Sequence, residues 1–134
     1  MGYLEINPHD RPDICTVMVK AVVALVAGDV VVWDPTAKDG ISVNTTTTAD
    51  SPYIAGVIVE AIDAGKYGKM QVSGFCPTVK IDGGTTDVAA DAILATSAVA
   101  GYAYTATGTA GTILGHAPTA VASKTTGAAY IKLA

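Results

Sequence analysis

Small or branched apolar residues alternate with polar ones over several short stretches of the chain, a pattern typical of half-buried β-strands. Residues 53–62 (YIAGVIVEAI) and 69–75 (KMQVSGF) both have this near-two-residue period. Between them lies AGKYG at 64–68, whose glycines suit a tight connection. The pattern therefore predicts two strands joined as a hairpin.

Further strands are predicted on both sides of this hairpin. Residues 16–34 (TVMVKAVVALVAGDVVVWD) contain two apolar runs separated by AGD, which predicts two strands joined by a tight glycine turn. Residues 78–81 (TVKI) predict a short strand closed by DGG. The stretch 35–52, with ISVN and a threonine run, has too little apolar content for a central strand, so we expect it at the surface.

The region 88–100 is the ambiguous one, because its alanines would also permit a helix. Its larger apolar residues do not form a continuous helical stripe, and we predict a strand. The tail 127–134 (GAAYIKLA) alternates apolar and polar positions, as a closing edge or barrel strand would.

Two segments about sixty residues apart are similar in sequence. Residues 54–72 and 113–131 share an isoleucine, two glycines and an alanine at matched positions. The matched pairs are Ile54 with Ile113, Gly56 with Gly115, Ala61 with Ala120, and Gly68 with Gly127. The dipeptide VK at 19–20 recurs at 79–80, and AGD at 27–29 can be set beside AAD at 89–91. These matches suggest an internal duplication, although composition alone would supply a couple of them.

Composition supports an all-β fold. Half of the residues are apolar but only 6% are aromatic, and 14 glycines interrupt the chain. β-branched side chains suit a pleated sheet, and glycine disfavours helices. We predict one compact β-barrel or β-sandwich domain over residues 16–134. If the duplication holds, the domain is pseudo-symmetric, with corresponding strands covering each other's apolar faces.

Residues 1–15 differ from this domain. They hold two prolines, four charged residues and no sustained period, so we expect an extended N-terminal arm. Within it Tyr3, Leu4 and Ile6 are apolar without a local core, which is typical of residues that contact a partner.

Charge and hydropathy narrow the range of partners. A net charge of −4 and scattered basic residues argue against direct nucleic-acid binding. The longest apolar run is interrupted by Lys20 and Asp29, so we predict no membrane span. The N-terminus has no signal-peptide pattern, and we expect folding in the cytosol. There Cys15 and Cys76, which lack CxxC spacing, are predicted to be two buried thiols, with a disulfide as the less favoured alternative.

Candidate chemistry is sparse. His9 lies in the predicted arm and His116 in a predicted turn, so no histidine pair could bind zinc and no general base is evident. The acids Asp82, Asp87 and Asp91 lack calcium-loop spacing. We predict no enzymatic activity, no metal and no cofactor. Trp33 is either a core residue, which we favour, or an interface anchor.

The order of these motifs resembles the head decoration, or capsid cement, proteins of tailed bacteriophages. The matching features are AGDVVVWD at 27–34, IAGVIVEAI at 54–62 followed by GKMQVSGF at 68–75, and the closing segment 113–133. The resemblance implies a β-barrel of the β-tulip or β-clip kind, commonly a homotrimer. It also implies a place on the outer face of the virion, where the protein clamps adjacent major capsid proteins.

Members of this family often reach the capsid with an N-terminal extension, so the resemblance makes the arm a candidate capsid contact. Our chosen contact residues are Tyr3, Leu4, Ile6 and Pro8. The main alternative is a carbohydrate-binding module that stacks sugars on Tyr102 and Tyr104, which lie two apart and would share one face of a strand. A small hydrolase is the third hypothesis.

Overall fold

A computed structural model describes residues 14–49, 51–82, 87–106, 113–122 and 125–133. Within these ranges the secondary structure is all β, as the sequence predicts. The strands are β1 (Cys15–Ala21), β2 (Val30–Trp33), β3 (Ser42–Asn44), β4 (Ile54–Ile58), β5 (Tyr67–Ile81), β6 (Ile93–Thr96), β7 (Ala103–Thr105), β8 (Gly115–His116) and β9 (Thr125–Lys132). No helix in this part of the chain is long and apolar enough to cross a membrane.

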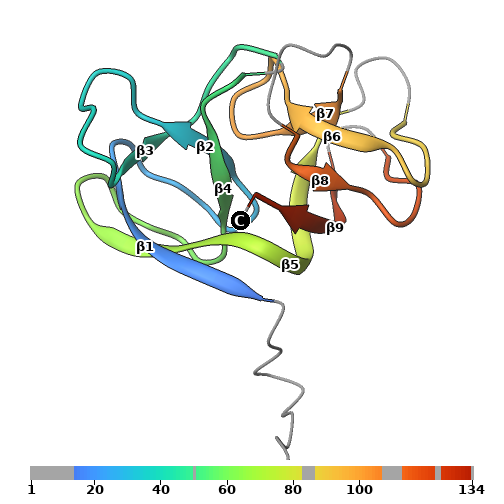
Figure 1. The fold of residues 1–134 in the computed structure, drawn as a ribbon, viewed down its shortest axis with the longest axis horizontal. Coiled ribbons are helices and arrows are strands. Elements are labelled where there is room, and N and C mark those ends of the chain that lie inside the picture. The colour runs from blue at the N-terminus through green and yellow to red at the C-terminus, as the bar shows by residue number, and fades with distance from the viewer. Residues whose placement is uncertain (1–13, 50, 83–86, 107–112, 123–124, 134) are drawn as a thin grey trace, which may run out of the picture.

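The strands close into two five-stranded barrels that share β5 (Figure 1). In the N-terminal barrel the order is β1-β3-β2-β4-β5, and β5 pairs again with β1 to close the ring. In the C-terminal barrel the order is β5-β7-β6-β8-β9, and β9 closes onto β5. The predicted β-barrel is confirmed, and β9 is the closing strand that the tail pattern indicates.

The two barrels have the same topology. Strand β1 corresponds to the C-terminal half of β5, β2 to β6, β3 to β7, β4 to β8, and the N-terminal half of β5 to β9. In each ring one pair is parallel, β1 with β3 or β5 with β7, and the other four are antiparallel. The sequence similarity between the halves therefore reflects a repeated structure.

Register and hydrogen bonds repeat as well. Leu25 and Ile62 exchange two backbone hydrogen bonds of 2.8 and 2.9 Å in the N-terminal barrel. Val88 and Val121 exchange two of 2.9 Å at the corresponding place in the C-terminal barrel. These bridges show which residues correspond even where loops differ in length.

The matched glycines occur where backbone and side chains approach closely. A Cβ on Gly56 would lie 2.5 Å from the carbonyl oxygen of Gln71, and one on Gly115 would overlap the carbonyl oxygen of Tyr130. Gln71 and Tyr130 are themselves equivalent, because each pairs with the residue after the glycine. No larger residue fits without moving backbone, which explains why both halves keep glycine here.

Each barrel has its own hydrophobic core, and the two cores correspond residue by residue. All ten members of the N-terminal core have equivalents in the C-terminal core. In order the pairs are Val19/Val79, Ala21/Ile81, Leu25/Val88, Val31/Leu94, Val43/Ala103, Ala55/Leu114, Ile58/Ala117, Ile62/Val121, Met70/Ala129 and Val72/Ile131. The same strand positions thus point inward in both barrels.

Strand β5 corrects the prediction of two separate strands at 69–75 and 78–81. It runs unbroken for 15 residues from Tyr67 to Ile81 and forms part of both barrels. Gly74 takes φ +94° and the register with β9 shifts between Cys76 and Val79. Bulges and a glycine absorb the irregularity that looks like a strand break in the sequence.

Strand β3 corrects the expectation that residues 35–52 lie wholly at the surface. Ser42–Asn44 lies between β1 and β2, and Val43 is fully buried. Only one apolar side chain of this strand enters the core, so no alternation marks it in the sequence.

The predicted glycine turn between the first two strands is also wrong in its detail. Gly28 does have φ +92° just before β2, but β1 ends at Ala21 and β3 separates β1 from β2. The pairing of AGD with AAD is one residue out, because the structural equivalent of Gly28 is Asp91, which has φ +64°. The two residues also make equivalent hydrogen bonds. The Gly28 amide donates to the carbonyl of Ile58 at the end of β4, and the Asp91 amide donates to the carbonyl of Ala117 just after β8. The prediction of strand within 88–100 is confirmed by β6.

Candidate interaction surfaces

Trp33 ends β2 and is half buried, packing against the N-terminal core. Its other side lines a groove of about 390 Å³ together with the exposed ring of Tyr53. Asp34, Asn44 and several threonines add polar groups to this groove. Trp33 thus packs on the core and is also accessible in the groove. The groove is a candidate site for a small polar ligand.

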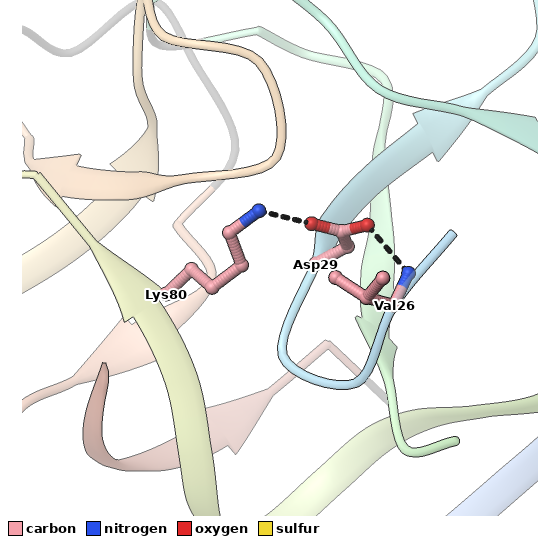
Figure 2. A network of polar contacts seen from close by, with 3 residues as sticks. All are labelled: Val26, Asp29 and Lys80. Atoms are coloured by element: carbon pink, nitrogen blue, oxygen red, sulfur yellow. Dashed lines mark hydrogen bonds and ion pairs between the residues drawn. The ribbon is translucent and has the colours of Figure 1, made fainter. Parts of the chain in front are cut away.

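A polar contact joins the two barrels (Figure 2). The ammonium group of Lys80 on β5 donates to Asp29 Oδ1 at 2.7 Å, and the Val26 amide donates to Asp29 Oδ2 at 2.8 Å. Asp29 is 5% exposed, so its charge needs these partners. Nearby, the Val30 amide donates to the carbonyl of Gly101 at 2.9 Å, which ties the start of β2 to the loop before β7.

Lys80 also contacts the ring of Tyr102, one of the two tyrosines predicted to stack sugars. Lys80 Nζ lies 4.7 Å from the centre of the Tyr102 ring, a cation–π contact. Tyr102 and Tyr104 are both half buried. Tyr102 therefore serves the contact between the barrels, and the pair does not form a free aromatic platform.

An apolar patch covers the outside of the C-terminal barrel. Ile93, His116 and Tyr130 are direct neighbours on the adjacent strands β6, β8 and β9. The His116 and Tyr130 rings stack with centroids 5.2 Å apart, and Phe75 meets Tyr130 edge-on at 5.2 Å. Ile93, Ile113 and Tyr130 are 49%, 50% and 40% exposed. We name Ile93, Ile113, His116 and Tyr130 the outer patch.

Two further apolar residues are exposed on β1, Val17 at 37% and Met18 at 60%, and as consecutive strand residues they point to opposite sides of it. On one side β1 pairs with β5 along its length, but it pairs with β3 only at Lys20 and Ala21. Among the described residues, the remaining edge of β1 has no strand beside it. We name Cys15, Val17 and Met18 the edge patch.

The cysteines and His116 differ from their predictions. Cys15 is exposed at the start of β1, so only Cys76 is a buried thiol, and both are free. The prediction for Cys15 fails because the first half of β1 lies outside the barrel core. Burial raises the pKa of the Cys76 thiol. Cys15 is the accessible thiol of the two because it is exposed. His116 lies in β8 rather than in a turn.

Within the described ranges, no three residues among His, Cys, Asp and Glu gather so that they could hold a metal ion. The predicted capsid contacts Tyr3, Leu4, Ile6 and Pro8, together with His9, lie outside the described residues. The sequence did not reveal either apolar patch, because exposed and core strand residues look alike when the packing of the barrels is unknown.

Comparison with solved structures finds this architecture in known proteins. Neither a family model nor a curated protein sequence matches the chain. One of these structures is the head fiber gp8.5 N base of bacteriophage phi29, which matches with a TM-score of 0.60. The match covers 90% of this chain and 96% of that one at 17% sequence identity. The two proteins share a fold.

Proposed function

We propose that this chain is a structural protein of a tailed-phage head that attaches to the outer surface of the capsid as a homotrimer. It contacts major capsid proteins and reinforces the joints between them. The observation that carries this proposal is the likeness to a phage head fiber base along nearly the whole chain. The resemblance of the sequence motifs to capsid cement proteins supports it independently.

The shape of the molecule suits such a role. Two closed barrels fused through one 15-residue strand form a stiff unit, because closure removes most free sheet edges and the Asp29–Lys80 pair holds the barrels together. Reinforcing a capsid requires a rigid protein with surfaces that bind capsid subunits. We propose that the protein is not an enzyme.

Attachment is proposed to use the N-terminal arm, with Tyr3, Leu4, Ile6 and Pro8 as contacts. The arm leads directly into β1. An extended arm can add to a sheet edge of a capsid subunit. Three arms on one trimer would raise the apparent affinity by about 10²- to 10⁴-fold over a single arm through effective concentration.

Binding to expanded heads that lack the protein tests this function. The full chain should saturate such heads, and deletion of residues 1–10 should abolish or sharply weaken occupancy while the circular dichroism spectrum and melting temperature stay unchanged. The triple variant Tyr3→Ser/Leu4→Ser/Ile6→Ser should lose head binding to the same extent as the deletion. The matched control Glu5→Gln/Asp10→Asn keeps the apolar residues and should bind normally. Undiminished binding of the deletion variant would reject the arm, and no binding by the full chain would reject the function.

A carbohydrate-binding module stays the alternative. The groove beside Trp33 and Tyr53, which combines aromatic rings with amide and hydroxyl groups, suits it better than Tyr102 and Tyr104. A glycan screen of the full chain separates the two functions: a specific sugar ligand lost in Tyr53→Ala, without head binding, would favour the alternative.

A further inference from the structure

The C-terminal core has four members beyond its ten equivalents of the N-terminal core. Three of them, Val30, Ile54 and Val57, come from the outside of the N-terminal barrel, and the fourth is Cys76 on β5. The outer face of the N-terminal barrel therefore packs into the side of the C-terminal barrel along β5. This buried contact is the way one repeat of this fold binds the next.

The residues equivalent to these four are all exposed. Register makes Ile93 the equivalent of Val30 and His116 that of Val57, because each pair occupies the same place in the β2–β4 or β6–β8 ladder. Ile113 corresponds to Ile54. Three of the four residues of the outer patch are thus the counterparts of a face that the first repeat buries, and the fourth, Tyr130, corresponds to buried Gln71.

The receiving side is repeated in the same way. Val17 pairs with Met70 as Cys76 pairs with Ala129, so Val17 on the edge patch corresponds to the fourth buried residue. Cys76 is 3% exposed and Val17 is 37% exposed. Each chain therefore presents both halves of its own internal contact, at opposite ends of the repeat, with neither half covered by described residues.

Charge is complementary at the edge of this contact. Within the chain, a Cβ at Gly28 would lie 3.3 Å from Cγ of Lys80. The equivalent of Gly28 is the exposed Asp91, and the equivalent of Lys80 is Lys20 beside the edge patch. If the internal contact were repeated between two chains, the acidic Asp91 of one copy would lie on the side of the contact where the other copy has the basic Lys20.

We infer that the outer patch of one copy binds the edge patch of a second copy, head to tail, reproducing the contact between the two barrels. Two parts of the internal contact are not repeated. Asp29, which pairs with Lys80, corresponds to Ala92, so this ion pair has no counterpart at the open end. The Lys80 amide donates to Gly28, whereas the equivalent amide of Lys20 donates to Ile41 within its own barrel. The association between copies therefore relies on side chains, with Asp91 and Lys20 at its border.

A head-to-tail contact is heterologous, so it closes into a ring or continues as a chain. The number of copies in such a ring rests on the proposed function. With the homotrimer proposed there, the head-to-tail contact gives a ring of three copies and six barrels. Exposed apolar residues in two matched patches supply the favourable burial that such a ring needs.

Complementary variants test this contact in solution. A face variant, Ile93→Lys/Tyr130→Lys, removes the outer patch, and an edge variant, Val17→Lys/Met18→Lys, removes the receiving side. In size-exclusion chromatography with light scattering, the unchanged chain should have three times the 13.5 kDa mass of one copy. Each variant alone should be monomeric, and an equal mixture should form one-to-one dimers, because one intact face and one intact edge remain. The control Tyr53→Lys alters an aromatic residue outside both patches that is more exposed than Tyr130, 60% against 40%, and should leave the trimer intact.

The outcomes separate this inference from the proposed function. A monomer for the unchanged chain up to millimolar concentration, or a mixture of variants that stays monomeric, would overturn the head-to-tail contact. If the chain is monomeric and both variants also lose head binding, the two patches bind the capsid protein and not a second copy of this chain. Mass in open-ended multiples would support the contact and reject the trimer. Maleimide labelling of Cys15, which should slow at least tenfold on assembly and recover in the edge variant, gives a second readout independent of mass.

Discussion

The N-terminal and C-terminal barrels share a topology but fill their cores differently. Ile58 and Met70 are the large residues of the N-terminal core where the C-terminal core has Ala117 and Ala129. The reverse holds at two other positions. Ala21 and Ala55 of the N-terminal core correspond to the larger Ile81 and Leu114 of the C-terminal core. Volume is redistributed within a fixed backbone frame, which cores tolerate when total volume and patterning are kept.

Positions set by backbone contact behave differently from these core positions. The glycines of β4 and β8 lie against a carbonyl of the neighbouring strand and are unchanged between the repeats. The comparison teaches that the strand ladder constrains the sequence more strictly than the core does. It also shows that a shared fold can survive the loss of most sequence identity.

The largest effect is expected at the invariant glycines. Gly115→Ala places a methyl group on the Tyr130 carbonyl oxygen and should cost about 3 kcal/mol or more, with Gly56→Ala close behind. Urea unfolding followed by circular dichroism measures this. Gly65→Ala is the control, because nothing lies within 4 Å of its Cβ and only its φ of +79° is strained, at about 1 kcal/mol. Equal costs at Gly115 and Gly65 would contradict the close-approach explanation.

The redistributed cores give the next largest effect. Leu114 is fully buried, and Leu114→Ala should destabilise the protein by about 2–5 kcal/mol through lost packing and a cavity. The equivalent residue in the first repeat is Ala55, and Ala55→Leu should also destabilise, by about 1–3 kcal/mol, because Ile58 and Met70 already fill that core. A stabilising Ala55→Leu would show that the first core is underpacked and that the repeats are not balanced by volume.

The link between the barrels is expected to contribute less. Lys80→Met removes the cationic partner of buried Asp29 and should cost about 1–3 kcal/mol, because among the described residues the carboxylate then keeps the Val26 amide but no positive charge. The equivalent Lys20→Met should change stability by less than about 0.5 kcal/mol when measured on dilute monomer. Equal effects of the two substitutions would remove the distinction between the linked and the open end of the repeat.

The smallest effect concerns a loop that only the first repeat has in this form. The backbone amide of Ile41 donates to the carboxylate of Asp39, as do the hydroxyl and amide of Ser42, and they lower the pKa of Asp39 to about 2 from 3.8. A lowered pKa means that the stabilisation is complete above about pH 4 and is lost as pH falls toward 2. Asp39→Asn should flatten the dependence of melting temperature on pH in this window. An unchanged dependence in Asp39→Asn would contradict this explanation.

Much of the fold follows from sequence pattern, and the misses have physical causes. The repeat is detectable because Gly56 and Gly115 cannot vary. The correspondence of Gly28 with Asp91 is missed because an aspartate can adopt the same left-handed conformation as glycine. The continuity of β5 is hidden by Gly74 and Pro77, which resemble a break but lie at irregularities in one strand.

The interaction surfaces are harder to predict than the strands. Ile93 and Leu94 look equally apolar in sequence, yet one is 49% exposed and the other fully buried. Which face is covered depends on how the barrels pack on each other, and no local pattern contains that information. Trp33 shows the same limit, since it lines the core on one side and a groove on the other.

Electron microscopy of a virion that carries this chain tests the central claim most directly. We predict three copies of a two-barrel density on the outer surface of the head, with β1 toward the capsid shell. Heads without this density, or the density at the tail or inside the shell, would contradict a capsid-reinforcing role.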